Sequence, residues 1–289
     1  MMRYEKPKAL LLAAVLPWTV VLTAQQSAVT RLGDNAALRY WSAFAQMRDS
    51  SISPDQAKEL QAILEGTAPY DDLKHRDLVE RNRFAVETLQ RGAELSNCDW
   101  GLEYQLASEA PIEHVRKALA LGRLNVLYSM HQFQIGDRSG GIRTLSGGIR
   151  FSRDVAAGGP LIAALAGKTL LLSHLRLVAF AAVKKALSPS EKALISSALG
   201  RIGAEGIDWQ AAIGREFDVL ARPGAPAPAA VQEQYRRTLV NPGQLPDLQK
   251  AIASTPEAVA GRIMNPQRVL DQKRELDEQL RATHLRLRE

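Results

Sequence analysis

Apolar residues recur at steps of three and four along most of this chain, which is the spacing of one face of an α-helix. Residues 34–47 show this spacing, and the segment starts with Asp34 and Asn35, whose side chains are suited to cap a first helical turn. The clearest helix follows Pro111 and carries one apolar stripe made of Ile112, Val115, Leu119, Gly122, Val126, Met130 and Phe133. The pattern therefore predicts an all-α fold from about residue 34 onward.

Start and stop signals divide this pattern into separate helices. Residues 53–56 (SPDQ) supply a capping serine, a proline at the first helical position and a glutamine that closes a capping box, and Gly66 ends this helix. Residues 70–95 then predict one long helix that is dense in opposite charges. Residues 188–191 (SPSE) start a further helix later in the chain.

The connections between helices are short. Only Gly136 and Asp137 separate the helix after Pro111 from the next one, and such a connection makes two helices antiparallel neighbours. The predicted architecture is a bundle of antiparallel helical hairpins that resembles an irregular tetratricopeptide array. No repeat of about 34 residues is visible, so the pattern does not support a regular solenoid.

Two of the predicted helices have an unusual composition. Residues 161–187 are apolar on nearly every side, which indicates a buried central helix, and His174 and Arg176 argue against a second membrane span. Residues 139–143 (SGGIR) recur as 146–150, so both glycine pairs fall on nearly the same helical face. Such glycines either cradle a phosphate or let a neighbouring helix approach closely. The second interpretation fits better, because no strand and no lysine–serine or acidic partner accompanies them.

The N-terminal segment has the order of a secretory signal. Arg3, Lys6 and Lys8 precede an apolar run over residues 9–24. A cleaved signal fits better than an uncleaved anchor or a buried core helix, because a membrane span needs about 20 residues and Pro17 breaks the run. We therefore expect an exported protein, either periplasmic, extracellular or anchored in the inner membrane. The predicted parts are a signal peptide or anchor (1–24), a helical core (34–222), a Pro/Ala linker (223–230) and a C-terminal helical extension (231–289).

Composition and charge exclude some classes of function. The formal net charge is +6, but basic and acidic residues alternate along the body, and no basic run with interleaved aromatic residues suggests a nucleic-acid site. The five histidines do not stand at metal-ligand spacings, and no Walker, Rossmann or G-x-S-x-G pattern occurs. We therefore expect no cofactor, no metal and no nucleic-acid partner, and a membrane contact only through an uncleaved N-terminal segment.

Three segments in order resemble landmarks of a family of uncharacterised bacterial proteins with signal peptides and all-α bodies. They are residues 34–44 (DNAALRYWSAF), 98–101 (CDWG) and 158–162 (GGPLI), so the resemblance covers roughly residues 34–180. It implies export and a helical fold. It implies no activity and no catalytic residues.

Two groups of residues are candidates for a site. The predicted loop after residue 95 holds Cys98, Asp99, Trp100 and Glu103. A thiol beside carboxylates is a poor nucleophile, because negative neighbours raise its pKa, so the simpler interpretation is that Trp100 anchors the loop and Asp99 caps a turn. The second group is a stripe made of Arg143, Arg150 and Arg153, which is either a solvated or ion-paired helix face or an anion site.

Two classes of function remain open. The first is a non-enzymatic interaction or scaffold protein of the cell envelope, with a protein partner or a second copy docking through the C-terminal helices. The second is an exported enzyme, such as a hydrolase, whose site is assembled from scattered polar residues. A cavity that gathers Cys98, Asp99, Glu103 or a histidine with a perturbed pKa favours the enzyme.

Overall fold

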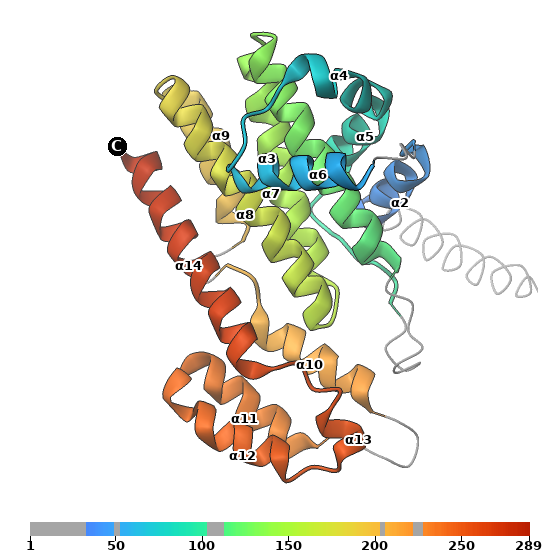
Figure 1. Ribbon diagram of the computed structural model, residues 1–289, viewed down its shortest axis with the longest axis vertical. Coiled ribbons are helices and arrows are strands. Elements are labelled where there is room, and N and C mark those ends of the chain that lie inside the picture. The colour runs from blue at the N-terminus through green and yellow to red at the C-terminus, as the bar shows by residue number, and fades with distance from the viewer. Residues whose placement is uncertain (1–32, 49–52, 103–112, 203–205, 222–227) are drawn as a thin grey trace, which may run out of the picture.

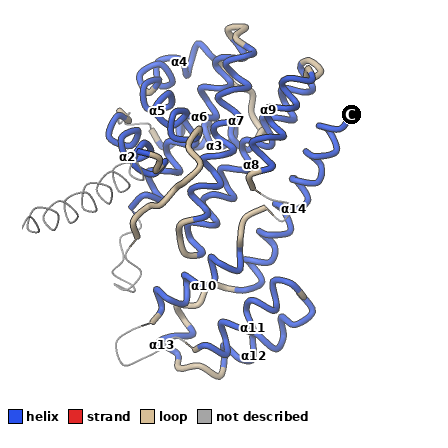
Figure 2. Tube along the Cα trace, turned by 180° about the vertical axis from the view of Figure 1, so that it is seen from behind, coloured by secondary structure: helices blue, strands red, loops and turns tan. Residues whose placement is uncertain are grey.

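The computed structural model describes residues 33–48, 53–102, 113–202, 206–221 and 228–289, and every regular element among them is a helix (Figure 2). The all-α prediction is thereby confirmed. The elements are α2 (Ala36–Gln46), α3 (Pro54–Glu65), α4 (Asp72–Arg81), α5 (Arg83–Ala93), α6 (Glu113–Gln134), α7 (Arg138–Ala157), α8 (Leu161–Lys184), α9 (Pro189–Gly200), α10 (Trp209–Leu220), α11 (Ala229–Val240), η2 (Pro242–Gln244), α12 (Leu245–Ala253), α13 (Glu257–Ala260) and α14 (Pro266–Arg288).

The predicted helix starts are confirmed by their caps. The Asn35 side chain accepts a hydrogen bond from the Ala37 amide at the start of α2. Both serine–proline signals form full capping boxes, in which Ser53 pairs with Gln56 and Ser188 with Glu191. Each box satisfies amide donors that the first helical turn leaves without partners.

The prediction of a single helix over residues 70–95 is wrong, because the chain forms two helices, α4 and α5, with a break at Asn82. The Asn82 side chain is 1% exposed. It donates to the Leu78 carbonyl at 2.9 Å and accepts from the Arg48 amide at 2.9 Å. Asparagine side chains compete with the helix for backbone hydrogen bonds, and here that competition turns α5 away from α4.

Helices α7 and α8 lie at the centre of the upper bundle, between α6, α5 and α9 (Figure 1). They approach closely because small residues face one another. A Cβ added to Gly167 on α8 would lie 2.6 Å from the Cβ of Ala156 on α7. The side of α7 that faces α6 is also closely packed, because a Cβ added to Gly141 would lie 2.7 Å from the Phe133 ring. The repeated glycines lie within α7, so the structure supports close packing, as their spacing predicts.

Helix α8 is long and apolar enough to cross a membrane by length and composition alone, a test that core helices also pass. In the described part of the chain, 72% of its apolar window is buried under other helices. Its buried residues include polar groups, namely Lys168 and His174. These contacts agree with the central, buried position that its sequence predicts.

The C-terminal region packs back onto the bundle. Helices α10 to α13 lie at its lower end, and α14 returns along α8 and α9 (Figure 1). The apolar side of α14 shares one hydrophobic cluster with α8. Lys168 of α8, 3% exposed, pairs with Glu275 of α14 and donates to Gln272 at 2.7 Å. Much of the predicted linker lies outside the described residues, and the division into core and extension stays a prediction.

Candidate functional site

Trp100 occupies the centre of a buried aromatic cluster. Its side chain is 5% exposed, and its Nε1 donates to the Asp154 carbonyl oxygen at 2.8 Å. The rings of Tyr40, Phe44 and His114 stack on it at centroid distances of 5.6, 6.0 and 4.7 Å. Aromatic contacts of this kind stabilise a core beyond the area they bury. Trp100 therefore anchors the connection, which is the simpler of the two roles its sequence position suggests.

The three landmark segments meet at this tryptophan. The Asn35 side chain exchanges two 2.8 Å hydrogen bonds with the backbone of Asp99. A Cβ on Gly158 would collide with the Trp100 ring. The Asp99 carboxylate accepts from the Gly101 amide at 2.9 Å and so caps a tight turn. The three segments thus hold the start of α2 and the end of α7 against one loop, so their role here is to stabilise the fold.

Cys98 is not placed to react as a nucleophile. Burial raises the pKa of its thiol well above the usual value, and the carboxylates of Asp154 and Asp99 raise it further. Neither Cys98 nor Asp99 lines the cavities described below. Glu103, the third residue of the predicted catalytic group, lies outside the described residues.

Two buried histidines have strongly perturbed pKa values but face no cavity described here. Burial lowers the pKa of His114 to about 4 and that of His174 to about 4. His174 donates from Nδ1 to the Leu170 carbonyl at 2.7 Å and accepts at Nε2 from Asn125 at 3.0 Å. Both rings are fully buried and act as packed, neutral core residues.

A third histidine lies between two carboxylates. His131 of α6 contacts Asp72 at 2.5 Å through Nδ1 and Glu80 at 3.1 Å through Nε2. Burial favours a higher pKa for Asp72, but hydrogen bonds from His131 and Arg76 outweigh burial and hold it below its usual value. This cluster ties α4 to α6.

The predicted arginine stripe is divided between two environments. Arg153 forms an ion pair within the protein, in which its Nε donates to the buried Asp154 carboxylate at 2.8 Å. Arg143 and Arg150 instead line a cavity of about 260 Å³ together with Gln90, Gln132 and Ser146. The Arg143 guanidinium donates to the Ser139 hydroxyl at 2.6 Å. In the described residues no carboxylate lies within ion-pair distance of either arginine.

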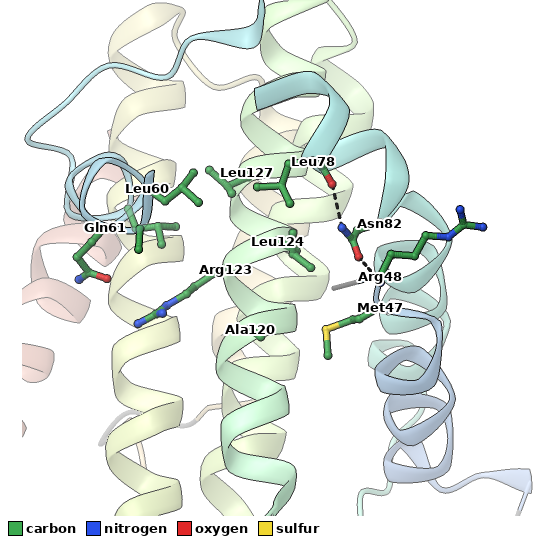
Figure 3. Close-up of a pocket in the computed structure, with 12 residues that line it drawn as sticks. Met47, Arg48, Leu60, Gln61, Leu78, Asn82, Ala120, Arg123, Leu124 and Leu127 are labelled. Atoms are coloured by element: carbon green, nitrogen blue, oxygen red, sulfur yellow. Dashed lines mark hydrogen bonds between the residues drawn. The ribbon is translucent and has the colours of Figure 1, made fainter. Parts of the chain in front are cut away.

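A second cavity, of about 230 Å³, lies between α2, α3, α4 and α6 (Figure 3). Its wall is mainly aliphatic, and Leu124 and Leu127 of α6 face Leu60 of α3 and Leu78 of α4. We call it the α3 groove, and define it by the residues Met47, Arg48, Ala57, Leu60, Gln61, Leu64, Leu78, Asn82, Ala120, Arg123, Leu124 and Leu127.

Positive charge flanks the α3 groove. Arg48 and Arg123 lie on opposite sides of its leucines (Figure 3). Both side chains are exposed, and neither forms an ion pair with another part of the chain that the structure describes. An apolar surface between two free guanidinium groups suits a ligand that is apolar in the middle and acidic at its edges.

The sequence pattern did not predict this groove, although α6 carries a signal for it. Ala120, Leu124 and Leu127 form a second apolar row on that helix, beside the stripe that begins at Ile112. Two apolar rows on one helix indicate two contact surfaces. The row does not reveal that α3 and α4, more than 35 residues earlier in the sequence, form the opposite wall.

Comparison with known proteins adds no relationship. No protein-family model, curated protein or solved structure matches this chain.

Proposed function

We propose that this chain is an exported, non-enzymatic binding protein that holds an apolar, acidic helical segment of a partner protein in the α3 groove. The observation that carries this proposal is the pairing of an aliphatic cavity with two unpaired arginines at its edges. Apolar anchors supply most of the affinity in such complexes, and charge complementarity supplies orientation and selectivity.

The dimensions of the groove suit a short helical ligand. Ala120 and Leu127 are seven residues apart on α6, so the floor is about 10 Å long, close to two helical turns. An engineered cavity of about 150 Å³ holds a benzene molecule, so about 230 Å³ accommodates one or two aliphatic side chains. An amphipathic helix offers such anchors at its i and i+3 or i+4 positions.

An enzymatic role has less support. A cavity that gathers Cys98, Asp99, Glu103 or a histidine with a perturbed pKa would favour an enzyme. The described members of that group instead cap and anchor the Trp100 loop, and the histidines with lowered pKa values are fully buried. We therefore propose binding rather than catalysis.

Docking through the C-terminal helices stays a prediction. The apolar side of α14 is covered by α8, which leaves its exposed charged side for any partner or second copy. Deleting residues 223–289 would uncover core residues and the buried Lys168 ammonium, so it does not test docking cleanly. Substitutions on exposed side chains are the better test.

The groove is tested with two labelled helical peptides whose leucines recur at steps of three and four. One peptide carries glutamate at the remaining positions and the other carries lysine. Fluorescence polarisation at low salt should show the glutamate peptide binding about 10-fold more tightly or better. Arg123→Glu should abolish this preference, because it reverses the charge at one edge of the groove.

The matched control is Arg116→Glu, which makes the same charge change on the same helix at a side chain that is 82% exposed and outside the groove. It should leave the preference intact. Equal binding of both peptides to the wild-type protein, or equal loss in both variants, would contradict the proposal. Binding of the lysine peptide alone would assign the groove to a different class of partner.

Export is tested separately by fusing residues 1–24 to a reporter enzyme that is active only outside the cytoplasm. We expect activity, because a basic start followed by a short apolar run is what the export machinery recognises. Replacing Leu11 and Leu12 with arginine should abolish it. An inactive fusion that is produced in normal amounts would show that the segment is not a signal.

A further inference from the structure

We propose that the cavity lined by Arg143, Arg150 and Ser146 is a binding site for a small tetrahedral oxyanion of the phosphate class. We call it the α7 cavity; it lies between α5, α6, α7 and α9 and is lined further by Gln90, Glu94 and Gln132. The inference does not depend on the α3 groove, whose lining residues are all different.

Uncompensated positive charge is the first observation. Arg143 and Arg150 are seven residues apart on α7, so both project from the same side of the helix. Arg201, at the end of α9, adds to the positive field at Arg150. Glu94 is the carboxylate that lines the cavity, and it forms no ion pair within the described residues. The site is therefore short of negative charge.

Buried donors without partners are the second observation. Ser146 is 1% exposed, lines the cavity, and its Oγ has no hydrogen-bond partner in the described part of the protein. The Nε of Arg150 is also buried and unpaired there. A buried donor without an acceptor loses its hydrogen bonds to water and gains none in return, so native proteins rarely leave two side by side. An oxyanion that accepts from both removes this cost.

The shape of the cavity is the third observation. Gly140 and Gly147 lie one heptad apart and form part of its wall, where they let the side chains of Gln132 and Gln90 approach α7 too closely for a Cβ. Behind them, Gln90 donates to the Asn125 side chain at 2.6 Å and to the Thr144 carbonyl at 3.2 Å. This network fixes the Gln90 amide at the cavity edge. The repeated SGGIR motif thus packs α7 closely and also supplies Ser146 and both arginines.

The chemistry of the donors favours a tetrahedral anion over a planar carboxylate. Guanidinium groups recognise phosphate through two parallel hydrogen bonds. The guanidinium groups of Arg143 and Arg150 and the Ser146 hydroxyl lie at different positions on the wall. They therefore suit an anion whose oxygen atoms point in several directions. Burial and the nearby Arg201 and Arg153 lower the pKa of Arg150, and the Glu94 carboxylate offsets this only in part.

The test is isothermal titration of the full chain with inorganic phosphate and, separately, with acetate and glycerol phosphate, in chloride at constant ionic strength. Phosphate should bind saturably and raise the thermal midpoint. Arg150→Gln and Ser146→Ala should each weaken binding about 10-fold or more. Arg116→Gln, the control on α6, should bind like the wild type. Tighter binding of glycerol phosphate than of phosphate would identify a phosphomonoester as the ligand.

The same variants separate a binding role from a structural one. Without phosphate, Arg150→Gln should keep or raise the thermal midpoint, because it removes a buried, repelled charge, whereas a structural arginine would lower it. The proposal is overturned if phosphate gives no saturable heat, or if acetate binds as tightly. The proposal is also overturned if Ser146→Ala and Arg150→Gln, each tested alone, both bind phosphate as tightly as the wild type. If Arg150→Gln fails to fold, Ser146→Ala alone decides.

Discussion

Replacing Gly148 with alanine should destabilise this protein by about 3 kcal/mol, although the same change in an open helix stabilises it by about 1 kcal/mol. A Cβ at this position would lie within 3.0 Å of His174 Nε2 and of Asn125 Nδ2. Both atoms are fully buried and hydrogen-bonded to one another. The methyl group therefore either separates α7 from α8 or breaks that hydrogen bond, which leaves the buried Nε2 of His174 without a partner.

Thermal and denaturant unfolding of the variant measure this effect. Gly200→Ala is the matched control, because Gly200 is also helical and nothing lies within 4 Å of a Cβ added there. It should leave stability unchanged or raise it by up to about 1 kcal/mol. Equal effects of the two substitutions would show that α7 and α8 are not packed as closely as described. The loss of stability in Gly148→Ala should be the same with and without phosphate.

The helices of this fold could be predicted because their signals are local. The side chains of a serine and of a glutamine or glutamate three residues later satisfy each other's backbone amides, and both capping boxes lie at the predicted helix starts. The break at Asn82 could not be predicted in the same way. Its side chain accepts from the Arg48 amide, 34 residues earlier, so the cause of the break is a tertiary contact.

The candidate sites depend almost wholly on such distant contacts. The arginine stripe was visible in the sequence, because steps of seven and three keep side chains on one side of a helix. Its division was not visible, since the Asp154 carboxylate that pairs with Arg153 also accepts from Tyr40 at 2.6 Å, and Tyr40 lies 114 residues earlier in the sequence. Periodicity shows which side a residue faces, but it does not show what lies opposite.

The glycine repeat shows how packing and binding share one motif. Gly141 and Gly148 contact Phe133 and His174 in the interior, whereas Gly140 and Gly147 border the α7 cavity. The sequence of the repeat allows two interpretations, a phosphate-cradling loop and a close helix contact. The helix contact is what the structure describes, and the proposed anion site uses the side chains beside the glycines rather than their backbone.

Acid should weaken the fold through His174. Its ring is neutral in the folded protein because the network around it has a fixed direction. Nδ1 donates to the Leu170 carbonyl, so Nε2 is left to accept from the Asn125 amide, which also donates to the Thr144 carbonyl at 3.1 Å. A proton on Nε2 would place two donors against each other. Burial lowers the pKa of His174 to about 4, although the hydrogen bond to the Leu170 carbonyl acts in the opposite direction.

The direction of the pH effect follows from the two pKa values. An unfolded histidine binds a proton near pH 6.5, whereas folded His174 does so only near 4. The unfolded state therefore gains protons first, and the free energy of unfolding decreases as the pH falls from about 6.5 to about 4. At about 1.4 kcal/mol per pKa unit, His174 alone accounts for about 3 kcal/mol. His114 acts in the same direction.

Two carboxyl groups oppose this trend, so the histidine has to be observed directly. Burial raises the pKa values of Asp154 and Glu216, and folded carboxyls that bind protons early stabilise the fold in acid. Nitrogen-15 NMR of the imidazoles should show one ring protonated at Nδ1 and bare at Nε2 that does not titrate above pH 5. His174→Gln should remove that signal and flatten the stability profile, and His284→Gln should do neither. A ring assigned to His174 that titrates near pH 6.5 would contradict the buried network that holds α6, α7 and α8 together.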